Sequence, residues 1–245
     1  MVSSEAADAP NLPPLFSGEA TGGDPLRVAV ARACAGTEPG LIVHRLRPEQ
    51  LSAALVLAPE APLADAMAMV FAAANGFADA FGALAPSEIA AQFDWPGGIR
   101  INGARCGGLR AAASSRDPKA EPDWLVIALD MPFRSDAARE PGEMPDRTTL
   151  VEEGCTGLAP MQLLESWSRH MLVWIHDWLE TGMTRLHAHW RARAFALGRD
   201  VAFTLAGERH AGRFVGLDER GGMLLGTGGR TRLLPLTLML EEVRC

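Results

Sequence analysis

The stretch that decides the fold runs from Asp94 to Arg110 and reads Asp-Trp-Pro-Gly-Gly-Ile-Arg-Ile-Asn-Gly-Ala-Arg-Cys-Gly-Gly-Leu-Arg. Trp95-Pro96-Gly97-Gly98 cannot continue a helix, because proline lacks a backbone donor and glycine opens positive φ angles. Apolar and polar residues alternate over 99–101, which predicts a half-buried strand. Asn102-Gly103 is typical of a two-residue hairpin turn. The stretch therefore predicts a corner followed by a β-hairpin.

The returning strand of this hairpin carries Arg105 and then two adjacent glycines, Gly107 and Gly108. Glycine weakens a strand, so a glycine pair indicates that something approaches the backbone closely. A cation, bare backbone and the Trp95-Pro96 corner within one hairpin point to a site for an anion or a nucleotide. The alternative is a glycine-rich hairpin with a purely structural role, and spacing alone leaves both interpretations open.

Composition excludes some classes of function. The 245 residues carry a net charge of −7, and no run of Lys or Arg occurs, whereas nucleic-acid-binding surfaces normally show a basic patch. We therefore expect no nucleic-acid partner. Lys119 is the one lysine and tyrosine is absent, so no phenol acts as acid, base or nucleophile.

Cysteine usage and apolar runs bear on the compartment. Cys34, Cys106, Cys155 and Cys245 form neither a CxxC pair nor a zinc pattern, and we predict reduced thiols in the cytoplasm. Cys106, next to Arg105, is either a thiol of lowered pKa or a buried inert one. The N-terminus lacks the features of a signal peptide. The apolar stretch 62–84 is interrupted by polar residues, so we expect no membrane partner.

The rest of the chain divides into a lead, a larger domain and a smaller one. Residues 1–14 are predicted to be a flexible lead, and 134–146 an exposed, mobile segment. Periodicity predicts helices over about 26–35, 62–83, 160–181 and 184–193, the first with Asp24 as N-cap and Pro25 at its first position. Buried strands are expected at 41–45, 51–58 and 124–131. From 197 onward, four short strands separated by glycine turns predict a small barrel.

The order of motifs resembles the catalytic half of biotin protein ligases, within the biotin/lipoate ligase superfamily. Members carry Lys-Trp-Pro-Asn-Asp and then Lys-Leu-Ala-Gly-Ile, which Asp94–Gly98 and Arg105–Leu109 match in position. Ala128–Met131 matches a strand that ends Gly-Ile-Asn-Met, and Thr149–Gly154 a Thr-Leu-Gln-Glu-Ala-Gly segment. The segment 216–225 is similar to a hairpin of the terminal barrel, and the resemblance covers roughly residues 40 to 243.

The resemblance implies a fold, a reaction and partners. The fold is α+β: a mixed, mainly antiparallel sheet packed by helices in residues 15–196, and a small SH3-like β-barrel in 197–245. In the implied reaction a biotin, lipoate or octanoate carboxylate attacks the α-phosphorus of ATP, which gives an acyl-adenylate and pyrophosphate, with magnesium as an optional ion. The acyl group then passes to a lysine of a carrier domain. Cations and backbone donors are needed to bring two anions together. Edge-strand pairing in the family makes a homodimer an open expectation.

The site residues implied by the resemblance are Arg105 as the catalytic cation, with Trp95, Gly97, Gly98, Gly107, Gly108 and Asp130 around the ligand. The departures are large. Asp94 stands where the family has lysine, Gly97-Gly98 replaces Asn-Asp, and Asp130 replaces asparagine. The glycine- and arginine-rich loop that covers the adenylate has no counterpart between Val43 and Leu51, where His44, Arg45 and Arg47 are the polar or cationic candidates.

Two further interpretations follow from these departures. Asp94 and Asp130 could form a carboxylate pair for a metal if they converge. The whole chain is either a divergent biotin/lipoate-type ligase or acyltransferase, or a non-catalytic relative that binds a small acyl or nucleotide ligand or a carrier domain.

Overall fold

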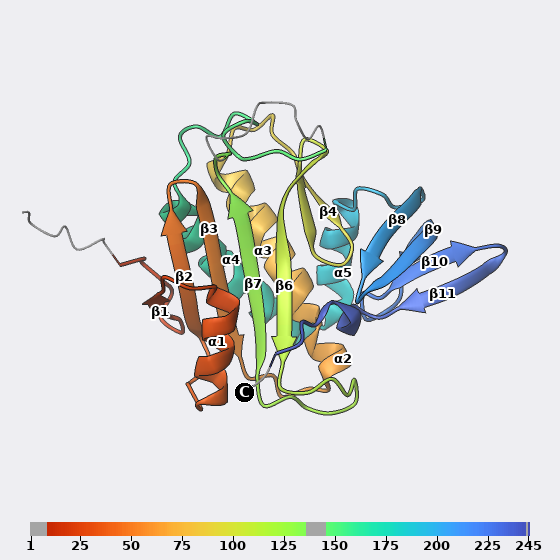
Figure 1. Ribbon diagram of the computed structural model, residues 1–245, viewed down its shortest axis with the longest axis horizontal. Coiled ribbons are helices and arrows are strands. Elements are labelled where there is room, and N and C mark those ends of the chain that lie inside the picture. The colour runs from red at the N-terminus through yellow and green to blue at the C-terminus, as the bar shows by residue number, and fades with distance from the viewer. Residues whose placement is uncertain (1–8, 136–145, 244) are drawn as a thin grey trace, which may run out of the picture.

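The computed structural model describes residues 9–135, 146–243 and 245 (Figure 1). Residues 1–8 of the predicted lead and most of the predicted mobile segment lie outside the described residues. Asn11, from the remainder of the lead, donates its backbone N–H to Glu165 Oε1 at 2.8 Å.

A seven-stranded sheet forms the centre of the larger domain. Its strand order is β1 (Ser17–Ala20), β2 (Leu41–Arg47), β3 (Gln50–Leu57), β7 (Leu125–Pro132), β6 (Ala104–Ala113), β5 (Gly98–Ile101) and β4 (Ala91–Asp94). Only β1 and β2 pair in parallel; the other neighbours in this sheet are antiparallel. The predicted mixed, mainly antiparallel sheet is confirmed, with the short edge strand β1 as an addition.

Helices cover the two faces of this sheet unequally (Figure 1). Behind it lie α2 (Leu63–Ala66), α3 (Ala68–Leu84), α4 (Pro160–Thr181) and α5 (Met183–Ala192). On the front, α1 (Pro25–Cys34) packs its apolar side against strand residues such as Val43, Ala54 and Val126. Four helices thus lie behind the sheet, whereas on the front α1 lies over the lower part of the sheet (Figure 1).

Helix ends follow the sequence closely. Asp24 caps α1 by accepting the Leu26 N–H at 3.2 Å, and Pro25 occupies the first turn, as predicted. The helix predicted from Pro62 is divided at Met67 into α2 and α3. The stretch Leu63–Leu84 is long and apolar enough to cross a bilayer, but 78% of its most apolar window is buried inside the protein, as expected of a core helix.

The C-terminal part is a four-stranded antiparallel sheet followed by a 3-10 turn. Its strands are β8 (Asp200–Leu205), β9 (Glu208–Leu217), β10 (Met223–Thr227) and β11 (Arg230–Leu234), with η1 at Leu236–Met239. The four predicted strands are present, and their closure into a barrel stays a prediction. Phe214, Met223 and Leu225 from this sheet belong to the same buried cluster as the helices behind the main sheet.

The predicted cysteine chemistry is wrong for two of the four residues. Cys34 at the end of α1 and Cys245 form a disulfide, while Cys106 and Cys155 are free and buried. The two partners are 211 residues apart in sequence. The fold brings them together because the segment after η1 returns to the front face beside α1, which spacing along the chain does not reveal.

Candidate functional site

The predicted hairpin is present as β5 and β6. Its turn residues Asn102 and Gly103 have φ angles of 49° and 88°, as a two-residue hairpin turn requires. β4 adds a third strand before it, and the Trp95–Pro96 peptide bond between β4 and β5 is cis.

Arg105 shares one carboxylate with a second arginine. Asp94 Oδ2 accepts from Arg100 Nε at 2.7 Å and lies 3.5 Å from Arg105 Nε. Arg100 also lies over the ring of Phe195, 4.1 Å from its centroid. The Arg105 side chain is 51% exposed, so it keeps much of its hydrogen-bonding capacity.

Arg105 and Trp95 line one cavity of about 220 Å³ between the hairpin and the C-terminal sheet. Gly107 is not among the residues that line it. Trp95 is 5% exposed, and its indole N–H donates to the Gly221 carbonyl at 2.9 Å. Trp95 therefore forms a wall of the cavity and also fastens the two sheets to each other.

Neighbouring strands explain the close approach that the glycines indicated. A Cβ on Gly107 would lie 2.3 Å from the Asp130 carbonyl oxygen, and one on Gly108 would lie 3.0 Å from that of Gly97. A Cβ on Gly97 would lie 2.8 Å from the Leu109 carbonyl oxygen, and one on Gly98 would meet the Asp94 side chain at 2.9 Å. Strand packing alone thus requires these glycines, although packing against a helix was the alternative we had expected.

Asp130 lies apart from the Arg105 cavity. Its carboxylate oxygen Oδ2 is 3.5 Å from Arg110 Nη1, whereas Asp94 is held by Arg100 and Arg105. The two carboxylates are engaged by different arginines. Within 9–135, 146–243 and 245, no group of three or more His, Cys, Asp or Glu side chains is placed to hold a metal ion.

Asp130 belongs to a row of residues on the front face, which we call the α1-face row: Arg45, Ser52, Asp130 and Gly108. They are matched across β2, β3, β7 and β6, since Arg45 pairs with Ser52, Ser52 with Asp130 and Asp130 with Gly108. Directly opposed residues point to the same face of a sheet. The row lies one step above the apolar residues that α1 covers.

Two atoms in this row are buried without a hydrogen-bond partner in the described part of the chain: Arg45 Nε and Ser52 Oγ. Ser52 is 1% exposed. Buried polar groups are nearly always paired in folded proteins, and each exception needs an explanation. A polar ligand lying across β2 and β3 would supply the missing partners.

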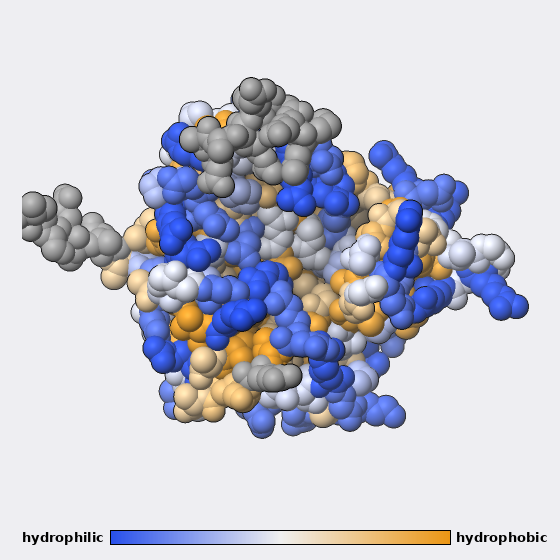
Figure 2. Space-filling view, viewed as in Figure 1, coloured by the Kyte–Doolittle hydropathy of each residue, from blue (hydrophilic) through white to orange (hydrophobic). Residues whose placement is uncertain are grey.

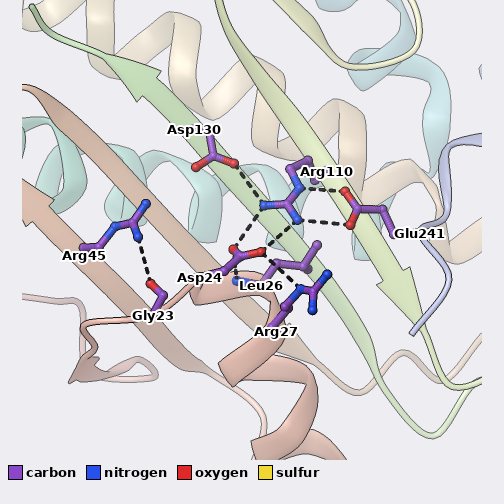
Figure 3. Close-up of polar contacts among 8 residues, drawn as sticks. All are labelled: Gly23, Asp24, Leu26, Arg27, Arg45, Arg110, Asp130 and Glu241. Atoms are coloured by element: carbon purple, nitrogen blue, oxygen red, sulfur yellow. Dashed lines mark hydrogen bonds and ion pairs between the residues drawn. The ribbon is translucent and has the colours of Figure 1, made fainter. Parts of the chain in front are cut away.

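Arg110 lies on the same face, one row below Asp130, and is surrounded by carboxylates (Figure 3). Its Nε and Nη2 donate to Glu241 at 2.6 and 3.0 Å, and Nη1 and Nη2 donate to Asp24 at 3.1 and 3.0 Å. Burial by itself raises the pKa of Asp24, but the hydrogen bonds and charge of Arg110 outweigh it and hold that pKa below its ordinary value. Hydrophilic side chains cross the middle of this face, with an apolar area beneath them (Figure 2).

The sequence signalled only part of this row. Asp130 and Gly108 were predicted through the family motifs, and Arg45 was noted as a cation in the shortened loop region. Ser52 in the row and Arg110 one row below it were missed, because their importance depends on register across the strands. The available signal for Ser52 was a single hydroxyl within an otherwise apolar strand.

Of the two interpretations of Cys106, the structure supports the buried, inert thiol. Burial, followed by the charges of Glu153, Cys155 and Glu152, raises its pKa to about 12. Arg105 is its neighbour in sequence but not the dominant influence on it, so the lowered pKa is wrong.

Comparison with known proteins agrees with this architecture. The model of the biotin/lipoate A/B protein ligase family matches residues 12–192. A biotin–[acetyl-CoA-carboxylase] ligase from Paracoccus denitrificans is 28% identical over 179 residues, covering 72% of this chain and 74% of that protein.

Solved structures extend the likeness over nearly the whole chain. A biotin protein ligase-like protein of unknown function from Silicibacter sp. tm1040 is 48% identical, with a TM-score of 0.87 over 96% of this chain and 100% of that one. The biotin protein ligase R40G mutant from Aquifex aeolicus, in complex with biotin, shares the fold, with a TM-score of 0.70 at 17% identity over 90% of this chain and 96% of its own. The family model spans β1 through α5, and the chain therefore belongs to the biotin/lipoate A/B protein ligase family.

Proposed function

We propose that this protein is a biotin/lipoate-type protein ligase that activates biotin, or a related acid, with ATP and transfers it to a carrier lysine. The observation that carries the proposal is the pair of unpartnered buried atoms in the α1-face row, Arg45 Nε and Ser52 Oγ. They stand in a chain of this ligase family, and the Paracoccus relative is named as a biotin ligase.

The row fits a ligand with both acceptor and donor groups. Arg45 Nε donates, and the Ser52 hydroxyl donates or accepts. Asp130 accepts from ligand N–H groups, because only one of its oxygens lies near Arg110. A ureido ring such as that of biotin offers both a carbonyl acceptor and N–H donors, whereas lipoate and octanoate offer neither outside the carboxylate. The row therefore supports biotin over the other two acids.

Arg105 is proposed as the cation for the phosphate end of ATP. It lies at the mouth of the cavity beside Trp95, and its guanidinium is only loosely paired with Asp94. Arginine binds phosphate oxygens in a bidentate manner. ATP, when bound, supplies the leaving pyrophosphate; the protein's part is to hold the acid and offset the charge that develops.

A second candidate function is binding without turnover. Three carboxylates surround Arg110, and Asp94 lies beside Arg105. The positive charge of each arginine is therefore offset by neighbouring carboxylates. The negative charge of these carboxylates opposes the approach of a triphosphate. The relative from Silicibacter is itself described only as biotin protein ligase-like.

The test measures pyrophosphate release and acyl transfer to a biotin carrier domain with ATP and biotin, lipoate or octanoate. Activity is expected with biotin, and Arg45→Gln is expected to lower biotin affinity about tenfold to a hundredfold, as for loss of a charged hydrogen bond. Arg209→Gln, at an exposed residue of the C-terminal strand β9, is the matched control and should bind as the parent does.

Arg105→Ala should lower turnover more than biotin affinity. Biotin binding without pyrophosphate release under any condition would favour the binding module. No binding of any of the three acids would overturn the ligase and the acyl-binding form of the second candidate.

A further inference from the structure

The segment after η1 lies along β6 and is held there by its backbone. We call residues 240–243 and Cys245 the strap. Leu240 bridges Ala111, and Glu241 donates its N–H to the Ala111 carbonyl at 2.8 Å. Arg116 Nη2 donates to the Leu240 carbonyl at 2.7 Å. β5 pairs with β6 only as far as Gly108, so the strap occupies the edge of β6 that β5 leaves open.

The strap places a carboxylate on Arg110. Glu241 accepts from both Nε and Nη2 of Arg110, the two-pronged geometry in which a free carboxylic acid would bind the same group (Figure 3). Glu241 is 39% exposed on its side chain, so solvent and salt weaken this ion pair. The Glu241–Arg110 ion pair by itself is therefore weak enough for another carboxylate to replace Glu241.

A covalent bond holds the other end of the strap. Cys245 is bonded to Cys34, the last residue of α1. The disulfide therefore anchors the strap four residues beyond Glu241, on the side opposite to η1. Cys245 is exposed and Cys34 half-buried, so a dithiol reaches this bond, whereas Cys106 and Cys155 are buried.

Charge explains why Glu241 must leave before another anion arrives. Arg110 already faces three carboxylates, those of Asp24, Asp130 and Glu241, and a second guanidinium, that of Arg27, approaches only Asp24, at 3.9 Å. A fourth carboxylate would meet net repulsion. Asp24 is fixed by capping α1 and Asp130 by its central strand, so Glu241 is the carboxylate free to move.

We propose that the strap is a redox-sensitive latch: the Cys34–Cys245 disulfide holds Glu241 on Arg110, and its reduction frees Arg110 for the carboxylate of a ligand lying over the α1-face row. In the reduction, one thiolate of a dithiol attacks a sulfur of the disulfide and breaks the S–S bond. The second thiolate then closes the dithiol's own disulfide and releases both cysteines, which take up one proton each. The dithiol is oxidised by two electrons and the latch is reduced by two.

The latch is tested first without any ligand, by hydrogen exchange of the Glu241 amide. Exchange is expected to quicken by about tenfold or more when the protein is treated with dithiothreitol, and equally in Cys245→Ser without reductant. Dithiothreitol should change nothing further in Cys245→Ser, which excludes effects through Cys106 and Cys155. Equal protection of the Glu241 amide in the oxidised and reduced protein would overturn the latch.

The gating of Arg110 rests on the proposed function and is tested with biotin and biotinamide, which lacks the carboxylate. Reduction and Glu241→Gln are each expected to tighten biotin binding about tenfold and to leave biotinamide unchanged. Glu242→Gln, at an exposed neighbouring position, is the matched control and should bind biotin as the parent does. Equal biotin affinity in the two redox states, with binding present, would overturn the gating. Absence of biotin binding in every state would overturn the proposed function and with it the gating, while the exchange result still decides the latch.

Discussion

Ser52 shows how a single residue marks the front face. It lies inside β3 with 1% of its surface exposed, and its hydroxyl has no partner among the described residues. An unpaired buried hydroxyl costs about 1–3 kcal/mol. Ser52→Ala is therefore expected to raise the free energy of unfolding by about 0.5–2 kcal/mol while weakening biotin binding, measured by urea titration and calorimetry.

Ser168→Ala is the matched control for that substitution. Ser168 is also fully buried, but its hydroxyl donates to the Glu165 carbonyl at 2.9 Å, so its loss should cost about 1 kcal/mol. If Ser52→Ala lowered stability as Ser168→Ala does, the hydroxyl would be satisfied in the free protein. The argument for a ligand across β2 and β3 would then fail.

For single residues, contacts between positions close in sequence were predicted better than contacts between strands. Asp24 and the Asn102-Gly103 turn depend on contacts a few residues away, and both were predicted correctly. Arg110 and Ser52 depend on which strands lie side by side. The sequence suggested that Asp94 and Asp130 could form a carboxylate pair for a metal. In the fold, Asp94 pairs with Arg100 and Asp130 lies near Arg110.

At the scale of elements, α1 is the helix that joins the strap, the row and the sheet. Asp24 caps its first turn and pairs with Arg110. Asparagine caps as well as aspartate but carries no charge, so Asp24→Asn isolates the ion pair and Asp24→Ala removes the cap as well. Asp24→Ala is expected to cost about 1 kcal/mol more than Asp24→Asn in unfolding free energy at neutral pH.

The ion-pair part of that cost depends on pH. The pKa of Asp24 is lower in the folded protein than its ordinary value near 4, so its charge stabilises the fold above that value. The stabilisation is lost as pH falls through the folded pKa. The difference between the parent and Asp24→Asn should be constant from pH 7 to about 5 and shrink below about pH 4. A difference that does not shrink at all as the pH falls below about 4 would contradict the ion pair.

Helices and strands were predictable wherever their apolar period is strong. α3 and α4 repeat apolar residues at three- and four-residue steps, and β7 is a continuous apolar run. β1 escaped prediction because its four residues, Ser-Gly-Glu-Ala, are mostly exposed and gain their strand structure only by pairing with β2. The disulfide was not predicted either, because it too depends on a contact between distant parts of the chain: its two cysteines are 211 residues apart in sequence.

At the scale of the whole molecule, the two sheets share one core. Phe214, Met223 and Leu225 pack into the cluster that also holds α3, and the Trp95 indole donates to Gly221 across the junction. Trp95→Phe keeps an aromatic ring but leaves the Gly221 carbonyl without its donor. An unpaired buried group costs about 1–3 kcal/mol. We therefore expect the free energy of unfolding to fall by that amount, in one transition that moves as a whole.

Two probes distinguish a shared core from two separate ones. Tryptophan fluorescence follows the larger domain, since all six tryptophans lie between residues 95 and 190, and hydrogen exchange of β8–β11 amides follows the C-terminal sheet. The two midpoints should coincide in the parent and shift together in Trp95→Phe. Trp178→Phe, at a half-buried ring in α4 with no indole hydrogen bond among the described residues, should shift them less. Separate midpoints would mean that the C-terminal sheet folds on its own, and Trp95 would then be a wall of the Arg105 cavity without fastening the two sheets.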